Sequence, residues 1–400
     1  MIMTVRPRIP IVMYHTVGIP DAGWIWGYLT CPHPLFARQL ERLSARGYRA
    51  VTLDDVHESQ ITGTLPRGRQ LVMTFDDGYL DTWVYVYPLL KRAGWRGLVY
   101  VNPEFVDPGD QPRPNLEDVW SGRRAESDLQ TRGFLNWAEL EVMDHSGILQ
   151  VGCHSMSHTW YPTGPEIVDF HRPGLSTPWL AWNARPDHKP FYLKEDQSGF
   201  VPLGTPIQRN GRSLGIRRYF PDESQTAAVV AHVAEQGGAA FFETEGWREQ
   251  LLEIARQADQ GQGRAESDEE MRSRYRYEIE EAKRSLETRL GHPINHFCWP
   301  GGAYNDESWD VAAQVGFRTF TVKQSDPKRC QDPSAHLIRR MSSYHQYSLL
   351  GHTRTTADAE PLVHACDRML GYRGSSLALR IRKLLNAVGL IRGPLRERMP

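Results

Sequence analysis

Two adjacent carboxylates are the first residues in this chain whose types and spacing suggest chemistry. Asp76 and Asp77 directly follow the apolar segment 71–75 (LVMTF) and precede Gly78. Because successive side chains leave an extended segment in different directions, one carboxylate can bind a metal while its neighbour accepts a proton. The alternative is an ordinary Asp-Gly turn in which one Asp caps a helix.

Two histidines form a second candidate group. His154 and His158 lie in HSMSH, which follows the apolar segment 148–151. A spacing of four places both imidazoles on one side of a helical turn, within reach of one divalent ion. Such a pair arises by chance fairly often among 15 histidines. Together with one Asp of the pair, it predicts a two-histidine, one-carboxylate site that can acidify a bound water and polarise a carbonyl group.

Both groups follow segments that resemble buried strands in an alternating pattern. Strands are expected at 11–14, 49–53, 71–75, 97–101 and 148–151, with helices at 35–46, 79–93 and 137–143 between them. This alternation is typical of a parallel sheet or barrel. In such folds the chemistry gathers at the carboxyl ends of the strands.

The segment 159–265 breaks this pattern. It is rich in Pro, Gly, Arg and Trp, and helices are expected within it only at 224–236 and 246–258. Alternation resumes with a helix at 267–290, which opens on a capping-box sequence. A strand at 295–299, a helix at 306–315 and a strand at 319–322 follow.

Composition excludes several classes of protein. The 400 residues carry 47 Lys and Arg against 48 Asp and Glu, with 40% hydrophobic residues, as in a globular protein. Near-zero net charge gives no reason to propose nucleic acid as a partner. The five cysteines form no CxxC pair, which argues against a disulfide framework or a zinc ribbon and favours reduced thiols.

Targeting signals are expected to be absent. The N-terminal MIMTVRPRIP leads directly into the first strand without an apolar signal-peptide region. No apolar segment approaches the roughly 18 residues that a membrane span needs. We therefore expect a cytoplasmic protein.

The motifs resemble those of a known family. TFDDGY at 74–79 and HSMSH at 154–158 match the first two motifs of the NodB-homology polysaccharide deacetylases, carbohydrate esterase family 4. PIVMYHTV at 10–17, GYRAVTLDD at 47–55 and HFCWPGGAYND at 296–306 resemble segments of its poly-N-acetylglucosamine deacetylase branch. The resemblance implies an α/β fold, a distorted (β/α)7 barrel, here with a large insertion between motifs two and three.

The resemblance also implies roles for individual residues. Asp77, His154 and His158 would bind the metal, and Asp76 would be the general base. The backbone N–H of Gly301 would stabilise the oxyanion, and Tyr79 is assigned to the same oxyanion and substrate region. We expect a divalent cation, with Zn first and Co, Ni, Mn or Fe also compatible with these ligands.

Some positions depart from the family or are placed less firmly. Many members carry an Arg two residues before the motif-three proline, where this chain has Cys298, most simply a small buried residue. His345 is the first candidate for the late catalytic acid and His352 the second, with a surface histidine as the alternative. His15, at the end of the first strand, is a possible active-site neighbour or a buried structural histidine.

These assignments divide the chain into three parts. Residues 1–158 and 266–372 form the catalytic barrel, 159–265 a specificity insertion and 373–400 a basic tail. Aromatic residues of the insertion can stack on sugar rings and its arginines can hold phosphate, or the aromatic residues form a small core. The aromatic residues are Trp160, Tyr161, Trp179, Trp182, Phe191 and Tyr192, and the arginines are Arg172, Arg185, Arg209, Arg212, Arg217 and Arg218.

The tail 373–400 carries seven basic residues and one acidic residue. Leu377, Ile381, Leu384, Leu385 and Val388 have helical spacing, so the segment predicts a basic amphipathic helix. Such a helix can lie on an anionic membrane surface, here at the inner face. The alternative is a helix that is docked on the barrel and otherwise solvated.

The expected function is removal of an N-acyl group, most simply acetyl, from an amino sugar in surface-glycan biosynthesis. The substrate is expected to be nucleotide-linked or lipid-linked, since no export signal is seen. N-Deformylation is the rival chemistry, because formyl and acetyl differ by one methyl group. A carbohydrate-binding protein without catalysis is the rival class, against which the intact Asp76 and Asp77 argue. The sequence does not predict the oligomeric state.

Overall fold

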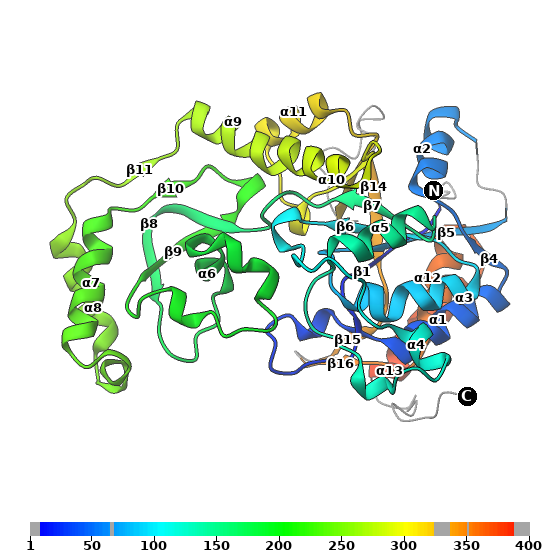
Figure 1. Cartoon of the computed structure of the whole chain (residues 1–400), viewed down its shortest axis with the longest axis horizontal. Coiled ribbons are helices and arrows are strands. Elements are labelled where there is room, and N and C mark those ends of the chain that lie inside the picture. Colours follow the sequence, from blue (N-terminus) through cyan, green and yellow to red (C-terminus); the bar gives the residue numbers. More distant parts are fainter. Residues whose placement is uncertain (1–8, 65–67, 324–336, 350–351, 388–400) are drawn as a thin grey trace.

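A parallel barrel forms the body of the molecule in this computed structural model, which describes residues 9–64, 68–323, 337–349 and 352–387. Seven parallel strands close on themselves because β1 pairs with both β5 and β14 (Figure 1). This confirms the expected (β/α)7 barrel. Around the barrel the strands are β1 (Ile11–Tyr14), β5 (Arg69–Phe75), β6 (Gly97–Val101), β7 (Leu149–Cys153), β12 (His296–Cys298), β13 (Thr319–Lys323) and β14 (Leu337–Ser342).

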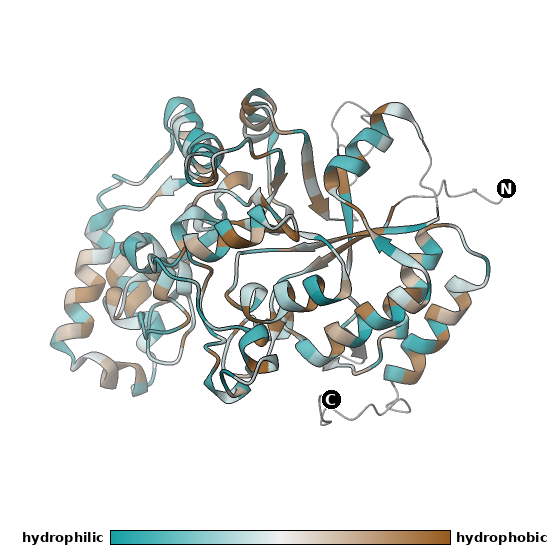
Figure 2. Cartoon of the chain, turned by 45° about the vertical axis from the view of Figure 1, so that its right-hand side comes forward, coloured by the Kyte–Doolittle hydropathy of each residue, from teal (hydrophilic) through white to brown (hydrophobic). Residues whose placement is uncertain are grey.

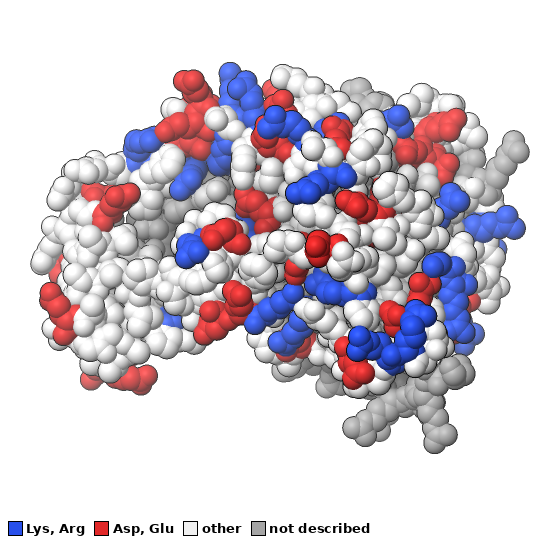
Figure 3. All heavy atoms as spheres, in the orientation of Figure 1, with Lys and Arg blue, Asp and Glu red and all other residues white. Residues whose placement is uncertain are grey.

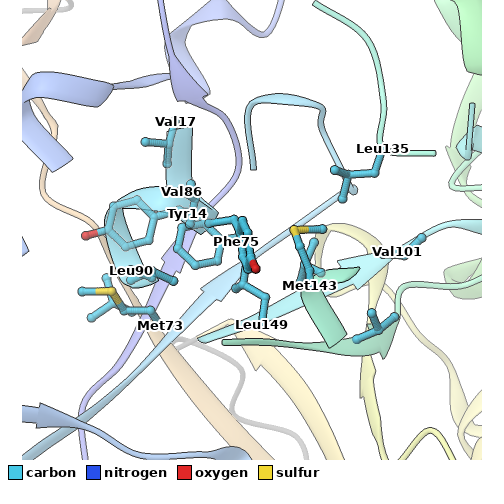
Figure 4. Close-up of a cluster of buried hydrophobic side chains, with 14 of the residues drawn as sticks. Tyr14, Val17, Met73, Phe75, Val86, Leu90, Val101, Leu135, Met143 and Leu149 are labelled. Carbon is cyan, nitrogen blue, oxygen red and sulfur yellow. The ribbon is translucent and has the colours of Figure 1, made fainter. Parts of the chain in front are cut away.

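The strand sequences are apolar because helices and the barrel interior cover both their faces. All five residues of β6 are buried, and Tyr14 of β1 stacks on Phe75 of β5 with ring centroids 5.3 Å apart. Figure 4 shows the buried cluster that contains this pair, with Leu90 and Met143 from the surrounding helices. This core fixes the strand ends that carry the site.

Helices surround the barrel, and their apolar and polar residues alternate along the ribbons (Figure 2). Most lie between consecutive strands, as expected from the alternating sequence pattern. They are α1 (His33–Ala45), α2 (Leu53–Thr62), α3 (Tyr87–Ala93), α4 (Leu116–Trp120), α5 (Trp137–His145), α9 (Asp268–Arg276), α10 (Ala282–Leu290) and α11 (Asp306–Val315).

Three local expectations need correction. The strand expected at 49–53 is β4 (Tyr48–Ala50), because Thr52 and Asp55 form a capping box that starts α2 at Leu53. The helix expected at 79–93 opens with a π-helical turn at Thr82–Val86 before α3 begins. A second π-helical turn, Tyr277–Glu281, separates α9 from α10 within the single helix expected at 267–290.

The insertion forms a lobe beside the barrel, at the left of Figure 1. Its long antiparallel strand pair, β8 with β9, was not expected from the sequence, whereas the two expected helices are confirmed as α7 and α8. These helices and the strand pair share a core of their own, formed by Phe170, Val229, Val233, Phe241 and Leu251. The elements are β8 (Trp160–Phe170), α6 (Pro178–Ala184), β9 (Pro206–Arg212), β10 (Tyr219–Phe220), α7 (Glu223–Glu235), α8 (Trp247–Ala258) and β11 (Arg264–Ala265).

The C-terminal part adds α12 (Glu360–Met369) and α13 (Ser375–Ala387), which pack on each other. Val388, part of the predicted amphipathic pattern, lies outside the described residues. Within the described chain, no helix combines the length and apolarity that a membrane span requires. Short strand pairs complete the fold: β2 (Val17–Gly18) with β3 (Cys31–Pro32), and β15 (Gln346–Leu349) with β16 (His352–Thr355).

Charges of both signs are interspersed over the face seen in Figure 3. This distribution agrees with a chain whose basic and acidic residues nearly balance. The insertion lobe and the barrel both contribute acidic and basic side chains to this face.

Candidate active site

Three predicted metal ligands meet at the carboxyl ends of β5 and β7. Nε2 of His154 lies 3.2 Å from Oδ1 of Asp77, and Nε2 of His158 lies 3.4 Å from the same oxygen. Nδ1 of His154 lies 2.8 Å from the Cys298 carbonyl oxygen, which fixes the ring with Nε2 toward Asp77. The fold therefore brings two imidazoles and one carboxylate within reach of a single point.

The donor set fits a divalent cation. Oδ1 of Asp77 is buried without a hydrogen-bond partner in the described structure, so a positive charge there would satisfy it. Burial raises the pKa of Asp77, but His158 and His154 outweigh it and hold the pKa below its usual value. Burial lowers the pKa of His158 to about 4. A carboxylate and a neutral imidazole are the forms that bind metal.

The ligand loop has an unusual backbone. Asp77, Ser155 and His158 have φ angles of 73°, 66° and 44°, a region that residues other than glycine rarely adopt. The two histidines therefore do not share a helical turn, and the helical geometry expected from their spacing is wrong. The loop brings them together through strained residues, a feature that concentrates at functional sites.

Asp76 lies next to these ligands and is tightly held. Arg340 of β14 donates two hydrogen bonds to it, from Nη1 to Oδ1 at 2.5 Å and from Nη2 to Oδ2 at 2.7 Å. Burial raises the pKa of Asp76, but Arg340 and the neighbouring histidines outweigh it and lower the pKa. On the open side, Nε2 of His15 lies 3.8 Å from Oδ2. Asp76 is thus an ionised carboxylate that faces the site.

A second group of possible ligands, Asp76, His154 and Cys298, lies nearby. The guanidinium of Arg340 contacts both Asp76 and Sγ of Cys298, the latter at 3.0 Å. A cation there would be repelled by the arginine at short range. The Asp77 group is therefore the better metal site.

The comparisons with known proteins agree with this geometry. Residues 65–170 and 239–320 match the family model described as polysaccharide deacetylase, and these two segments contain Asp76, Asp77, His154, His158 and Gly301. Over these two segments the chain is similar to the polysaccharide deacetylase family. Hydrolysis of amide bonds on acetylated sugars is the chemistry of the family.

The individual proteins that this chain resembles are distant from it in sequence. YxkH of Bacillus subtilis (strain 168), assigned as a polysaccharide deacetylase, is 28% identical over 101 residues. That match covers 25% of this chain and spans about a third, 34%, of YxkH. The BpsB deacetylase domain from Bordetella bronchiseptica has a TM-score of 0.49 at 18% identity, covering 84% of this chain and 95% of that one. IcaB from Ammonifex degensii has a TM-score of 0.45 at 17% identity, covering 90% and 97%.

The candidate site opens into a pocket of about 290 Å³. Tyr79 and Gly301, predicted to act on the oxyanion or substrate, line it together with His15. Burial raises the pKa of Tyr79 well above its usual value, and the nearby Asp77 adds to this, so the phenol stays protonated. The placement is compatible with the predicted roles of these residues.

His345 lies outside the pocket lining. It is buried, with Nδ1 2.5 Å from Oγ of Ser343 and Nε2 3.2 Å from the carbonyl oxygen of Tyr28. Burial lowers its pKa to about 4. The side chain of His352, the second candidate, lies outside the described part of the structure. Of the late histidines considered, the described structure thus places none at the pocket.

Sequence reasoning did not find three residues that hold the site. Arg340 binds Asp76, Asn102 donates Nδ2 to the carbonyl oxygens of His154 and Ser155, and Glu278 binds the same loop. Asn102 directly follows β6, and that position is the only sequence signal that these three residues carried.

Proposed function

We propose that this protein is a metal-dependent hydrolase that removes an N-acyl group, most simply acetyl, from an amino sugar. One observation carries the proposal: an ionised Asp76, held by Arg340, lies beside the Asp77, His154 and His158 ligand group in one pocket. The match of two segments to the polysaccharide deacetylase family model supports the same reaction class.

The reaction can be assigned to residues of this chain. Asp76 would accept a proton from water, whose oxygen adds to the acyl carbon. The Gly301 N–H would stabilise the resulting oxyanion. The C–N bond then breaks, and His15 would give the departing nitrogen a proton, so that a carboxylic acid and a free amine are released. A divalent cation held by Asp77, His154 and His158 would acidify the water and polarise the acyl oxygen.

His15 is a better placed acid than His345. It lines the pocket, and its Nε2 lies 3.8 Å from Oδ2 of Asp76, so it can exchange a proton with a reacting group there. His345, with both ring nitrogens in contact with protein oxygens and a pKa near 4, is neutral at neutral pH and poorly suited to donate a proton.

The experiment uses zinc-loaded enzyme with UDP-linked and undecaprenyl-linked N-acyl amino sugars, and identifies the released acid by mass spectrometry. We expect acetate; formate would instead establish the deformylase. Asp76→Asn and His154→Ala should each lower turnover by about 1000-fold or more, since each removes an element of the reaction. His145→Ala, an exposed histidine on α5, is the control. Retained turnover in Asp76→Asn would refute the assignment.

We also propose a cytoplasmic location with peripheral contact at the inner face of the membrane. The support lies in α13, where Leu377, Ile381 and Leu384 are 64%, 49% and 61% exposed. On its other side, Leu379 is buried and Asn386 donates to Asp358, so the helix is docked by one face. A substrate linked to lipid would be reached at that surface.

A further inference from the structure

The pocket is enclosed by aromatic residues from three parts of the chain. The barrel contributes Tyr79, Phe105 and Phe134, the segment before α1 contributes Trp26 and Tyr28, and the insertion contributes Trp160, Trp182 and Tyr192. These walls pack on one another: Trp26 stacks on Trp160 with ring centroids 6.1 Å apart. A pocket of about 290 Å³ with apolar walls suits one small ligand rather than an extended polymer.

One cationic side chain, that of Arg212, lies in this pocket wall. Arg212, the last residue of β9, donates Nη1 to the Gly301 carbonyl oxygen at 2.9 Å. Its guanidinium carbon lies 5.4 Å from the ring centroid of Trp160. A Cβ added at Gly301 would overlap the guanidinium, so the arginine packs directly on the predicted oxyanion segment. Arg212 is therefore fixed at the pocket by both the barrel and the insertion.

The guanidinium of Arg212 forms no ion pair in the described chain, where no Asp or Glu oxygen lies within 4.0 Å of it, and Asp77 attracts it only from a greater distance. Its Nε is buried without a hydrogen-bond partner. Of the two carboxylates of the pocket, Asp76 is paired with Arg340, and Asp77 faces the two histidines of the candidate metal site. Burial lowers the pKa of Arg212, and the attraction of Asp77 offsets this only in part. An unpaired cation in a partly dry pocket is costly unless a ligand supplies the anion.

Other arginines of the insertion show that this arrangement is unusual. Seven form ion pairs with carboxylates: Arg172 and Arg248 with Asp169, Arg185 with Asp187, Arg209 with Glu166, Arg217 with Asp268, Arg256 with Glu253, and Arg264 with Glu270. Arg218 resembles Arg212, since it lies over the Tyr161 and Phe220 rings without a carboxylate within 4.0 Å in the described chain. Arg218 does not line the pocket, and it therefore offers a matched control.

We propose that Arg212 binds an oxyanion of the substrate, and that the substrate is one N-acylated sugar residue carrying a phosphate or carboxylate group. The inference rests on the proposed function, because the phosphate or carboxylate of the substrate and its N-acyl group would occupy one pocket. The planar guanidinium suits both anions, which it can bind through two hydrogen bonds. The aromatic walls would cover the apolar faces of the sugar ring.

Three probes test this: methyl N-acetylglucosaminide, which is neutral, N-acetylglucosamine 1-phosphate, and N-acetylglucosaminuronic acid. We expect the wild type to favour at least one anionic probe over the neutral probe by about 10-fold or more in kcat/KM. Arg212→Gln should lower kcat/KM on that anionic probe by about 10-fold more than on the neutral probe, mainly through a higher KM. The preferred anionic probe distinguishes phosphate from carboxylate. Arg218→Gln should keep the wild-type preference.

Two results would overturn the inference. One is equal use of neutral and anionic probes by the wild type. The other is an equal loss on all probes in Arg212→Gln, which would make Arg212 a structural residue. If no probe is hydrolysed, the proposed function fails for these sugars, and calorimetric binding of N-acetylglucosamine 1-phosphate and of the uronic acid to wild type and Arg212→Gln decides the anion site. Equal binding by the two proteins would then refute it.

Discussion

Arg340 binds Asp76, the contact that an arginine of the third motif makes in many members of the family. The family's arginine position is occupied by Cys298, and Arg340 reaches the same carboxylate from β14, touching Sγ of Cys298 on the way. The small thiol of Cys298 leaves room for the Arg340 guanidinium. An arginine at position 298 would place a second cation beside it. The exchange explains how Asp76 stays ionised without the usual partner.

Arg340→Gln should lower kcat by about 10- to 100-fold, as is typical for residues that hold a catalytic group. Because Arg340 lowers the pKa of Asp76, its loss raises that pKa, and the acidic limb of the kcat/KM profile moves to higher pH. Arg340→Lys should restore part of the shift. A pH–rate profile of the three proteins measures this, and an unmoved limb would show that Arg340 does not control Asp76.

The ligand set was accessible from sequence because its residues lie in two short motifs at strand ends. The two histidines with one Asp of the pair followed from motif spacing and from the expectation that strand ends converge, whereas the choice of Asp77 as the ligand followed from the family resemblance. Arg340 could not be predicted in this way, because it reaches Asp76 only through the order β12, β13, β14 and β1 around the barrel. Residues that act through tertiary neighbours leave no local pattern.

The loop after β7 is the element on which the site depends most. Its strained residues are held by Asn102 and by Glu278, whose carboxylate accepts from the Ser157 N–H at 3.0 Å and from the Ser157 hydroxyl. Glu278 also accepts from the Ser213 hydroxyl at 2.9 Å, which joins the insertion to the loop. It lies in the π-helical turn between α9 and α10, a distortion that often marks functional positions.

Glu278→Ala should weaken metal binding by about 10- to 100-fold, because the loop that presents both histidines loses its anchor. Isothermal titration with zinc measures this on metal-free enzyme. Glu280→Ala removes an exposed carboxylate from the same π-helical turn and should bind as the wild type does. Unchanged affinity in Glu278→Ala would mean that the loop is held without it.

Elements with a regular sequence pattern were predicted well. The helix α11 begins and ends where the sequence indicated, at Asp306 and Val315. The antiparallel pair of β8 and β9 was not predicted, because Pro162, Gly164 and Pro165 interrupt the strand pattern. Its pairing also skips residues, with a register irregularity between Pro162 and Ile167.

At the scale of the whole molecule, α13 presents an apolar stripe outward. Leu377, Ile381 and Leu384 form the stripe, and the exposed Arg380 and Lys383 lie beside it. This combination is typical of helices that lie on anionic lipid surfaces. No residue of α13 is among the described residues that line the pocket.

Replacement of the three stripe residues by serine should abolish cosedimentation with vesicles of mixed neutral and anionic lipid, because each removes apolar area that the bilayer would bury. Binding of the wild type should also fall as salt rises. Leu252→Ser, on the exposed side of α8, is the control. Equal pelleting of the wild type and the triple variant would remove the membrane proposal.

Each end of the insertion is tied to the middle of the insertion, and this bears on how the lobe can be exchanged. Thr159 accepts a backbone hydrogen bond from Ser213 at 3.0 Å, and Tyr219 pairs with Ala265. The lobe therefore leaves and re-enters the barrel as a closed unit with its own core. Such a unit can be exchanged at one point of the chain without changing the order of the barrel strands. Replacement of the lobe would then change the insertion residues that line the pocket and leave the barrel residues of the candidate site in place.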